Sequence, residues 1–293
     1  MRLTNKLGLP SSIVNAVARD PYHRGDAHIS VTSLIGPARK RMLEIVHGDE
    51  LTEDVADRIW SLMGQIAHGI LERNDADGMT EERLFIERHG WRISGQFDRV
   101  LVEDKLVQDY KLSSTYATKD GVKPEWEAQA NLYALMLREH GYEIERAQIV
   151  VILRDYQKSK AQHDPGYPQA PVIVLDVPIW PMEQVEAYIH HRLEVHSQAQ
   201  HVLPLCSADE RWERPAKYAL VKDGNKRATS LHDDYASAYA ALEAASIGAK
   251  KGASFRIDTR PAEQIRCADY CAARPVCKQA DELLKAKRID FAA

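Results

Sequence analysis

The sequence has no run of about eighteen apolar residues, the length that a membrane-spanning helix requires. Residues 1–30 also lack the apolar core of a secretory signal peptide. Asp and Glu outnumber Lys and Arg by 43 to 39, so the net charge of −4 excludes a protein that attracts polyanions with its whole surface. We therefore expect a cytoplasmic protein with no membrane partner, in which any contact with a polyanion depends on local basic clusters.

Cysteine is scarce and unevenly placed. The chain has four cysteines, and the last three lie in its final tenth: Cys206, Cys267, Cys271 and Cys277. Without a secretory signal, this spacing around Pro275 favours a ligand cluster over a disulfide framework. Four thiolates can hold a [4Fe–4S] cluster or a tetrahedral zinc ion. The spacing alone does not separate these two centres from each other or from uncoordinated buried thiols.

Four short stretches contain the residue types of a hydrolytic metal site. In chain order they are residues 64–68, 95–98, 108–111 and 129–133. Carboxylates hold hard divalent cations, which stabilise charge on a phosphate and lower the pKa of water. A lysine beside such a carboxylate can orient an attacking water. Each stretch alone is a common surface or core pattern, but the ordered set indicates a site for phosphodiester hydrolysis.

The two aspartates of this set are expected on neighbouring strands. Residues 106–112 alternate as a strand does, so Asp109 and Lys111 project from one face. Residues 102–105 have the polarity of a hairpin turn, which brings Asp98, near the end of the preceding strand, alongside Asp109. Gly95 allows the backbone to be approached closely just before Asp98.

Two predicted helices supply the remaining side chains. His68 lies in the periodic apolar run 55–71, and its imidazole beside two carboxylates would make a mixed nitrogen and oxygen site, acceptable to Mg²⁺ and better suited to Mn²⁺. Gln129 and Tyr133 are four residues apart in the helical stretch 125–139, so they share a face. They can position a DNA strand or the lysine; the alternative is that Tyr133 is a core aromatic residue.

This set resembles the RecB-type branch of the PD-(D/E)XK nucleases, and residues 29–39 resemble the opening of its phage-type exonucleases. The resemblance implies an α/β restriction-endonuclease-like core, in which helices flank a mixed sheet. It also implies a catalytic lysine at Lys111, an accessory motif at Gln129 and Tyr133, and metal ligation by His68, Asp98, Asp109 and the backbone carbonyl of Tyr110.

Two details of this resemblance are less regular. The signature proline of the family is absent near Asp98. Glu82 resembles the acidic residue that often opens the first strand, and Glu81 could take its place in register.

The function that the resemblance implies is a DNA exonuclease dependent on Mg²⁺ or Mn²⁺. It would cleave linear DNA from its ends, leaving 5′-phosphate and 3′-hydroxyl products, in DNA recombination, repair or phage DNA processing. The protein would work in the cytoplasm of a bacterium or of a phage host, with a recombinase or a single-strand-binding protein as a candidate partner.

The cysteines extend the resemblance. Several RecB-type nucleases tether the C-terminus with an iron–sulfur cluster held by a cysteine triplet and one distant cysteine. Here the first gap in the triplet is three residues rather than the usual two, and the distant cysteine follows the nuclease core. Residues 203–206 and 210–212 are similar to a phage-type pattern. The resemblance implies a structural [4Fe–4S] cluster on Cys206, Cys267, Cys271 and Cys277, with Zn²⁺ as the alternative.

Local basic groups are the candidates for DNA contact, although such groups are more often solvated charges. They are Arg39, Arg41, Lys222 and Lys226, the last two flanking a predicted turn at 223–225. We expect residues 1–202 to form the nuclease core with an N-terminal helical segment. Residues 203–293 would form a segment with a hairpin, a helix and the four-cysteine centre, packed on the core.

The coarse layout predicts helices at 31–46, 53–72, 124–140, 182–198 and 234–247. Strands are expected at 82–88, 91–100, 105–112, 148–154 and 172–177, with a loop at 157–171. Two other functions remain open. The chain could be a catalytically silent DNA-binding or recombination accessory protein, or a zinc-stabilised interaction protein with an incidental acidic cluster.

Overall fold

The computed structural model describes residues 1–19, 25–75, 77–247 and 253–289. It divides into two compact units, Met1–Pro204 and Leu205–Ala293. The boundary expected after residue 202 thus falls two residues later. No helix in the described part of the chain combines the length and the apolar character needed to span a membrane.

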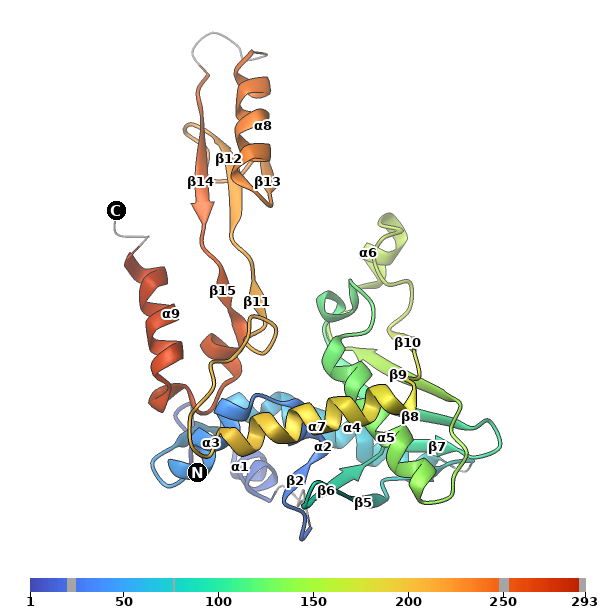
Figure 1. The fold of residues 1–293 in the computed structure, drawn as a ribbon. Coiled ribbons are helices and arrows are strands. Elements are labelled where there is room, and N and C mark those ends of the chain that lie inside the picture. Colours follow the sequence, from blue (N-terminus) through green and yellow to red (C-terminus); the bar gives the residue numbers. More distant parts are fainter. Residues whose placement is uncertain (20–24, 76, 248–252, 290–293) are drawn as a thin grey trace. The chain divides into compact units, whose positions relative to one another are not determined.

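The first unit is built on a five-stranded mixed sheet (Figure 1). Its strand order is β10 (Val172–Val177), β9 (Arg146–Leu153), β8 (Leu106–Ser113), β7 (Arg99–Leu101) and β4 (Met79–Thr80). Strands β8 and β9 are parallel, and the other neighbours are antiparallel. The buried residues of β9 alternate along the strand, so one face of β9 packs against the core.

A smaller sheet completes the core of this unit. It contains β2 (Ile29–Ser30), β6 (Trp91–Gln96) and β5 (Arg83–Arg88), with β6 between the other two. The expected strand 91–100 therefore divides into β6 and β7, which belong to different sheets. Asp98 lies in the two-residue connection between them.

Helices lie on opposite faces of β8. Helix α5 (Pro124–Glu139) covers the face that carries Lys111, because Lys111 Nζ donates to Gln129 Oε1 on α5 at 3.0 Å. Helix α4 (Ile59–Asn74) lies over the other face, where the ring of Tyr110 makes an edge contact with His68. The predicted arrangement of helices flanking a mixed sheet is confirmed.

The N-terminal helices differ from the prediction in their boundaries. The expected helix 31–46 is two helices, α2 (Val31–Ile35) and α3 (Ala38–Val46), because Gly36 precedes a proline and adopts an extended conformation. The expected helix 53–72 begins as strand β3 (Thr52–Asp54), paired with β1 (Arg2–Thr4), and a 3₁₀ turn, Val55–Arg58. The Asp54 side chain accepts a hydrogen bond from the Ala56 N–H at 3.1 Å and so caps that turn.

The remaining elements of the first unit are helices. They are α1 (Ser11–Ala18), α7 (Met182–Gln198) and the short α6 (Lys158–His163), which lies inside the predicted loop 157–171. The boundaries of α7 match the prediction.

The second unit contains a three-stranded antiparallel sheet with helix α8 (Tyr235–Ile247). Its strands are β13 (Ser230–His232), β12 (Lys217–Lys222) and β14 (Phe255–Arg260). The predicted turn between Lys222 and Lys226 is present, with Gly224 at φ +84°. Strand β11 (Glu213–Arg214), which precedes β12, pairs with β15 (Glu263–Gln264), which follows β14. The cysteine segment and helix α9 (Lys278–Ile289) come after β15.

Gly95 lies where β6 passes close to α5. A Cβ atom at this position would lie 2.6 Å from Met136 Sδ and 3.0 Å from Tyr133 Cε1. Nearly every residue of α5 from Trp126 to Leu137 is buried, so the helix has no room to move away. The close approach predicted for Gly95 is therefore confirmed, and its partner is the helix that carries Gln129 and Tyr133.

We expect Gly95→Ala to lower the free energy of unfolding by about 1–3 kcal/mol, because the added methyl group overpacks this contact. Urea denaturation measures the change. Gly64→Ala on α4 is the matched control: no atom lies within 4 Å of its new Cβ, and a helical Gly→Ala change should stabilise by about 0.5–1 kcal/mol. A Gly95→Ala protein as stable as the wild type would contradict the packing described here.

Candidate active site

Three acidic or imidazole side chains meet beside β6 and β7. His68 Nδ1 lies 3.3 Å from Asp98 Oδ1 and 3.5 Å from Glu81 Oε1. One ligand atom from each of the three lies within 4.8 Å of the other two, and the described residues contain no other such group of His, Cys, Asp or Glu. The two carboxylates raise the pKa of the His68 imidazole to about 10, Asp98 contributing most.

Glu81, rather than Glu82, belongs to this cluster. Glu81 has a left-handed backbone with φ +53°, and Gln96 Nε2 donates to its Oε2 at 2.7 Å. The Glu82 side chain is exposed on the surface, away from the cluster. Of the two acidic residues considered from the sequence, the structure brings only Glu81 to the site, because its backbone conformation interrupts the alternation of the strand.

Asp98 faces Asp109 across a hairpin. Arg99 pairs with Gln108 in the antiparallel register of β7 and β8, so the next position outward sets Asp98 opposite Asp109. Asp98 Oδ2 accepts a hydrogen bond from the Tyr110 N–H at 2.6 Å, while its Oδ1 faces His68. The side-by-side arrangement predicted for the two aspartates is present in the structure.

Asp109 is a buried carboxylate whose charge is opposed by one ammonium group. It is 2% exposed, and the Lys111 ammonium lies against its Oδ2. Within the described ranges, that oxygen has no hydrogen bond of acceptable geometry. Burial raises the pKa of Asp109 to about 6; Lys111 opposes this shift and Asp98 adds to it. A buried oxygen of this kind, next to a second carboxylate and an imidazole, suits a hard divalent cation.

A hydrogen-bonded chain connects Lys111 to α5. Lys111 Nζ donates to Gln129 Oε1, and Gln129 Nε2 donates to the Tyr133 hydroxyl at 2.9 Å. Gln129 and Tyr133 are 7% and 4% exposed, so a bound strand could not reach them directly. The arrangement lets them hold the lysine in place, one of the two roles considered from the sequence.

Within the first unit, the proposed DNA-contacting residues Arg39 and Arg41 are not among the residues of this site. Arg39 is 8% exposed, and its Nη1 donates to the Pro204 carbonyl at 3.2 Å, so its charge is used inside the first unit. Lys222 and Lys226 are exposed on the second unit. From the sequence, no role was assigned to Gln96, whose side chain donates a hydrogen bond to Glu81. Its position two residues before Asp98 is the only sequence feature that points to this role.

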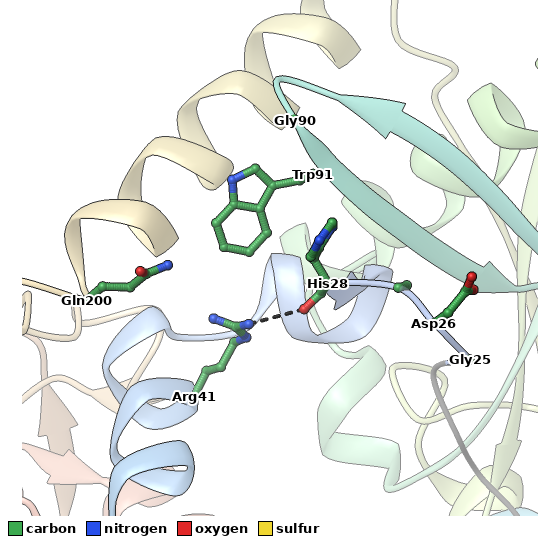
Figure 2. A pocket seen from close by; sticks show the side chains of 8 residues that line it. Gly25, Asp26, His28, Arg41, Gly90, Trp91 and Gln200 are labelled. Carbon is green, nitrogen blue, oxygen red and sulfur yellow. Dashed lines mark hydrogen bonds between the residues drawn. The ribbon is translucent and has the colours of Figure 1, made fainter.

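Arg41 lies in the wall of a separate cavity of about 470 Å³ at the opposite end of β6 from Asp98 (Figure 2). Its Nη2 donates to the His28 carbonyl at 3.2 Å, and its guanidinium lies 5.6 Å from the centre of the Trp91 ring. The cavity contains none of the metal-site residues.

The four cysteines all lie in the second unit, and no disulfide bond links any two of them. Burial raises the pKa of the Cys206 thiol to about 12, with further contributions from Glu210 and from the other three thiols, which therefore lie nearby. The Gln279 side chain accepts from the Cys206 N–H and donates to the Cys206 carbonyl, each at 2.9 Å. This pair of bonds ties Cys206 to the segment that follows Cys277.

Asp109 and Lys111 thus lie on β8, the central strand of the mixed sheet, and Asp98 lies opposite Asp109. A family model described as the PD-(D/E)XK nuclease superfamily matches residues 39–278. The chain belongs to this superfamily, whose members use divalent metals such as Mg²⁺ or Mn²⁺.

Solved structures resemble the chain more distantly. The crystal structure of SSO0001 is 16% identical, with 65% of this chain and 85% of that chain covered and a TM-score of 0.45. The crystal structure of a phage-related exonuclease from Haemophilus somnus 129PT is 15% identical, with 57% and 90% covered and a TM-score of 0.35. A comparison with curated protein sequences gives no match.

We expect Asp109→Asn to remove a pH-dependent cost of folding in the presence of a chelator. Between the usual pKa of 3.8 and the folded value of about 6, the folded state holds a proton that the unfolded state has released. The wild type therefore loses stability as pH rises through this window, by on the order of 3 kcal/mol, and the asparagine variant does not. Denaturation curves at pH 4 and pH 7 measure the difference; parallel pH dependence of both proteins would contradict the assignment.

Proposed function

We propose that the protein is a DNA exonuclease dependent on Mg²⁺ or Mn²⁺, releasing 5′-phosphate and 3′-hydroxyl products. The observation that carries this proposal is the buried Asp109 carboxylate, which lies against Lys111 and opposite Asp98, itself a member of the cluster with His68 and Glu81. Burying a carboxylate with a raised pKa is costly, and such groups concentrate at functional sites. A silent DNA-binding protein would have no use for it.

The residues that would hold the cation are Asp98, Asp109 and His68, with Glu81 as an additional ligand. The Tyr110 carbonyl is a further candidate: the N–H and C=O of one strand residue point to the same side, and the Tyr110 N–H points to Asp98. When bound, a divalent cation supplies Lewis acidity and lowers the pKa of a coordinated water.

The protein side chains have separate tasks in this proposal. The Lys111 ammonium neutralises charge on the scissile phosphate and orients the attacking water. Gln129 accepts from Lys111, and Tyr133 fixes the Gln129 amide, so the two residues keep the lysine aimed at the carboxylates. Action at DNA ends rests on the similarity of the Gln129 and Tyr133 motif to that of end-processing relatives. A recombinase or a single-strand-binding protein is the class of partner that such an enzyme would serve.

The test is degradation of labelled DNA that is linear or circular, and single- or double-stranded, with Mg²⁺, Mn²⁺ or a chelator. We expect metal-dependent loss of linear DNA only. Asp98→Ala and Asp109→Ala should each lower the rate at least about 10³-fold, because each removes a carboxylate needed to bind the metal. Lys111→Ala should slow cleavage severely while metal binding persists. Undiminished cleavage by Asp109→Ala would end the nuclease assignment, and cutting of circular DNA would replace exonuclease with endonuclease.

We further propose that Cys206, Cys267, Cys271 and Cys277 hold a structural [4Fe–4S] cluster. Cys267 and Cys277 are buried, and Cys206 lies close enough to the other three thiols for their charges to raise the pKa of its thiol. Four thiolates can also hold a tetrahedral zinc ion, which is the competing centre.

We expect the anaerobically purified protein to be brown and to absorb light at about 400 nm. Replacing any one of the four cysteines by Ser should remove the colour and lower the melting temperature, because the binding free energy of such a centre is folding free energy. Ala272→Ser, beside Cys271, is the control and should keep both. A colourless protein with one equivalent of zinc would replace the cluster by zinc, and full stability of the Cys206→Ser variant would remove Cys206 from the centre.

A further inference from the structure

Helix α4 carries His68 on one side and large apolar side chains on its outer side. None of its sixteen residues is buried, and Trp60 is 51% exposed. The periodic apolar pattern of this helix would ordinarily cover a core. Here part of the pattern faces outward from a helix that also supplies a residue of the active site.

Trp60 is covered on one side by Arg154. The Arg154 guanidinium lies 4.3 Å from the centre of the indole ring, close enough for a cation–π interaction. Arg154 is exposed and follows β9 directly, where its N–H donates to the Ser113 carbonyl at 2.9 Å. No carboxylate in the described part of the chain forms an ion pair with it, so its charge is not neutralised there.

A second exposed aromatic residue, Tyr116, lies on a turn that is joined to the end of β9. Asp155 accepts from the Thr115 N–H at 2.7 Å and from the Thr115 hydroxyl at 3.3 Å. These bonds hold the turn Thr115–Thr118, which carries Tyr116, against the end of β9. Tyr116 is 61% exposed. Exposed aromatic and guanidinium groups from three separate elements are therefore held at one end of the sheet.

This end of the sheet adjoins the active site. Strands β8 and β9 are parallel, and their carboxyl ends, at Ser113 and Leu153, lie two residues beyond the pair Lys111 and Val151. Trp60 precedes His68 by eight residues on α4, which is about 12 Å along the helix axis. At about 3.4 Å per stacked nucleotide, this distance corresponds to three or four nucleotides of one strand.

We propose that Trp60, Arg154 and Tyr116 form a stacking subsite for unpaired nucleobases of the DNA strand being cleaved. Aromatic faces next to basic groups bind single strands without sequence preference. Bases within a duplex are already stacked on each other, so the subsite selects strands that are single or frayed. This inference rests on the proposed nuclease function, because it assumes that the same strand reaches the catalytic carboxylates.

The experiment measures equilibrium binding of fluorescent oligothymidylates two to ten nucleotides long, with Mg²⁺, to full-length Asp109→Asn protein. We expect affinity to rise steeply once the oligonucleotide exceeds about four nucleotides and reaches Trp60. Trp60→Ala in this background should lower the affinity for long oligonucleotides between about five- and one-hundred-fold. It should leave the affinity for the dinucleotide unchanged, and Trp60→Phe should retain most of the length dependence.

Ile70→Ala is the matched control, because Ile70 is 49% exposed on the same helix but lies beyond His68. It should leave the length dependence intact. Sedimentation of each variant tests the competing occupant, a second copy of the chain on the apolar side of α4. If Trp60→Ala and Ile70→Ala both dissociate an oligomer and neither alters binding, the surface is a protein interface and the subsite is refuted.

The subsite and the proposed function can fail separately. The subsite would be overturned if the Asp109→Asn protein binds oligothymidylates equally well with and without Trp60→Ala. Cleavage of linear DNA by the wild-type protein would then leave the nuclease intact. Trp60-dependent, length-dependent binding without any cleavage would keep the subsite and overturn the nuclease. An absence of length dependence in the parent protein would also overturn the subsite.

Discussion

The candidate active site depends on two buried carboxylates, Asp98 and Asp109, that lie opposite each other. Two like charges so placed are unfavourable, and burial raises the pKa of Asp109 to about 6. The surrounding groups compensate in part: the Tyr110 N–H and His68 face Asp98, and Lys111 faces Asp109. A divalent cation bound there, as we propose, would supply the positive charge that these groups do not fully provide.

Much of this arrangement was predictable from local patterns. The alternation in residues 106–112 fixed the common face of Asp109 and Lys111, and the polar turn at 102–105 fixed the hairpin that sets Asp98 opposite Asp109. The spacing of Gln129 and Tyr133 placed both on one side of α5. These features depend on backbone periodicity over a few residues, which a sequence displays directly.

Other features depend on contacts that periodicity does not encode. The choice of Glu81 over Glu82 follows from a left-handed residue, which reverses the side that faces the site. The break at Gly36 follows from the proline after it, a signal that was present but outweighed by helical periodicity. The exposed side of α4 was not predictable, since its apolar spacing is that of a core-facing helix. Arg39 was expected on the surface because it is a basic residue, but its side chain is buried and donates to the carbonyls of Leu203 and Pro204.

The paired hydrogen bonds between Gln279 and the backbone of Cys206 have a consequence for how the proposed cysteine centre would be assembled. They join positions 73 residues apart without any sulfur ligand. The entropy of closing that long loop is therefore lost during folding of the polypeptide itself rather than during metal capture. The polypeptide itself would then bring Cys206 to the segment after Cys277 before any metal binds. A preformed cluster would be transferred to protein that is already folded.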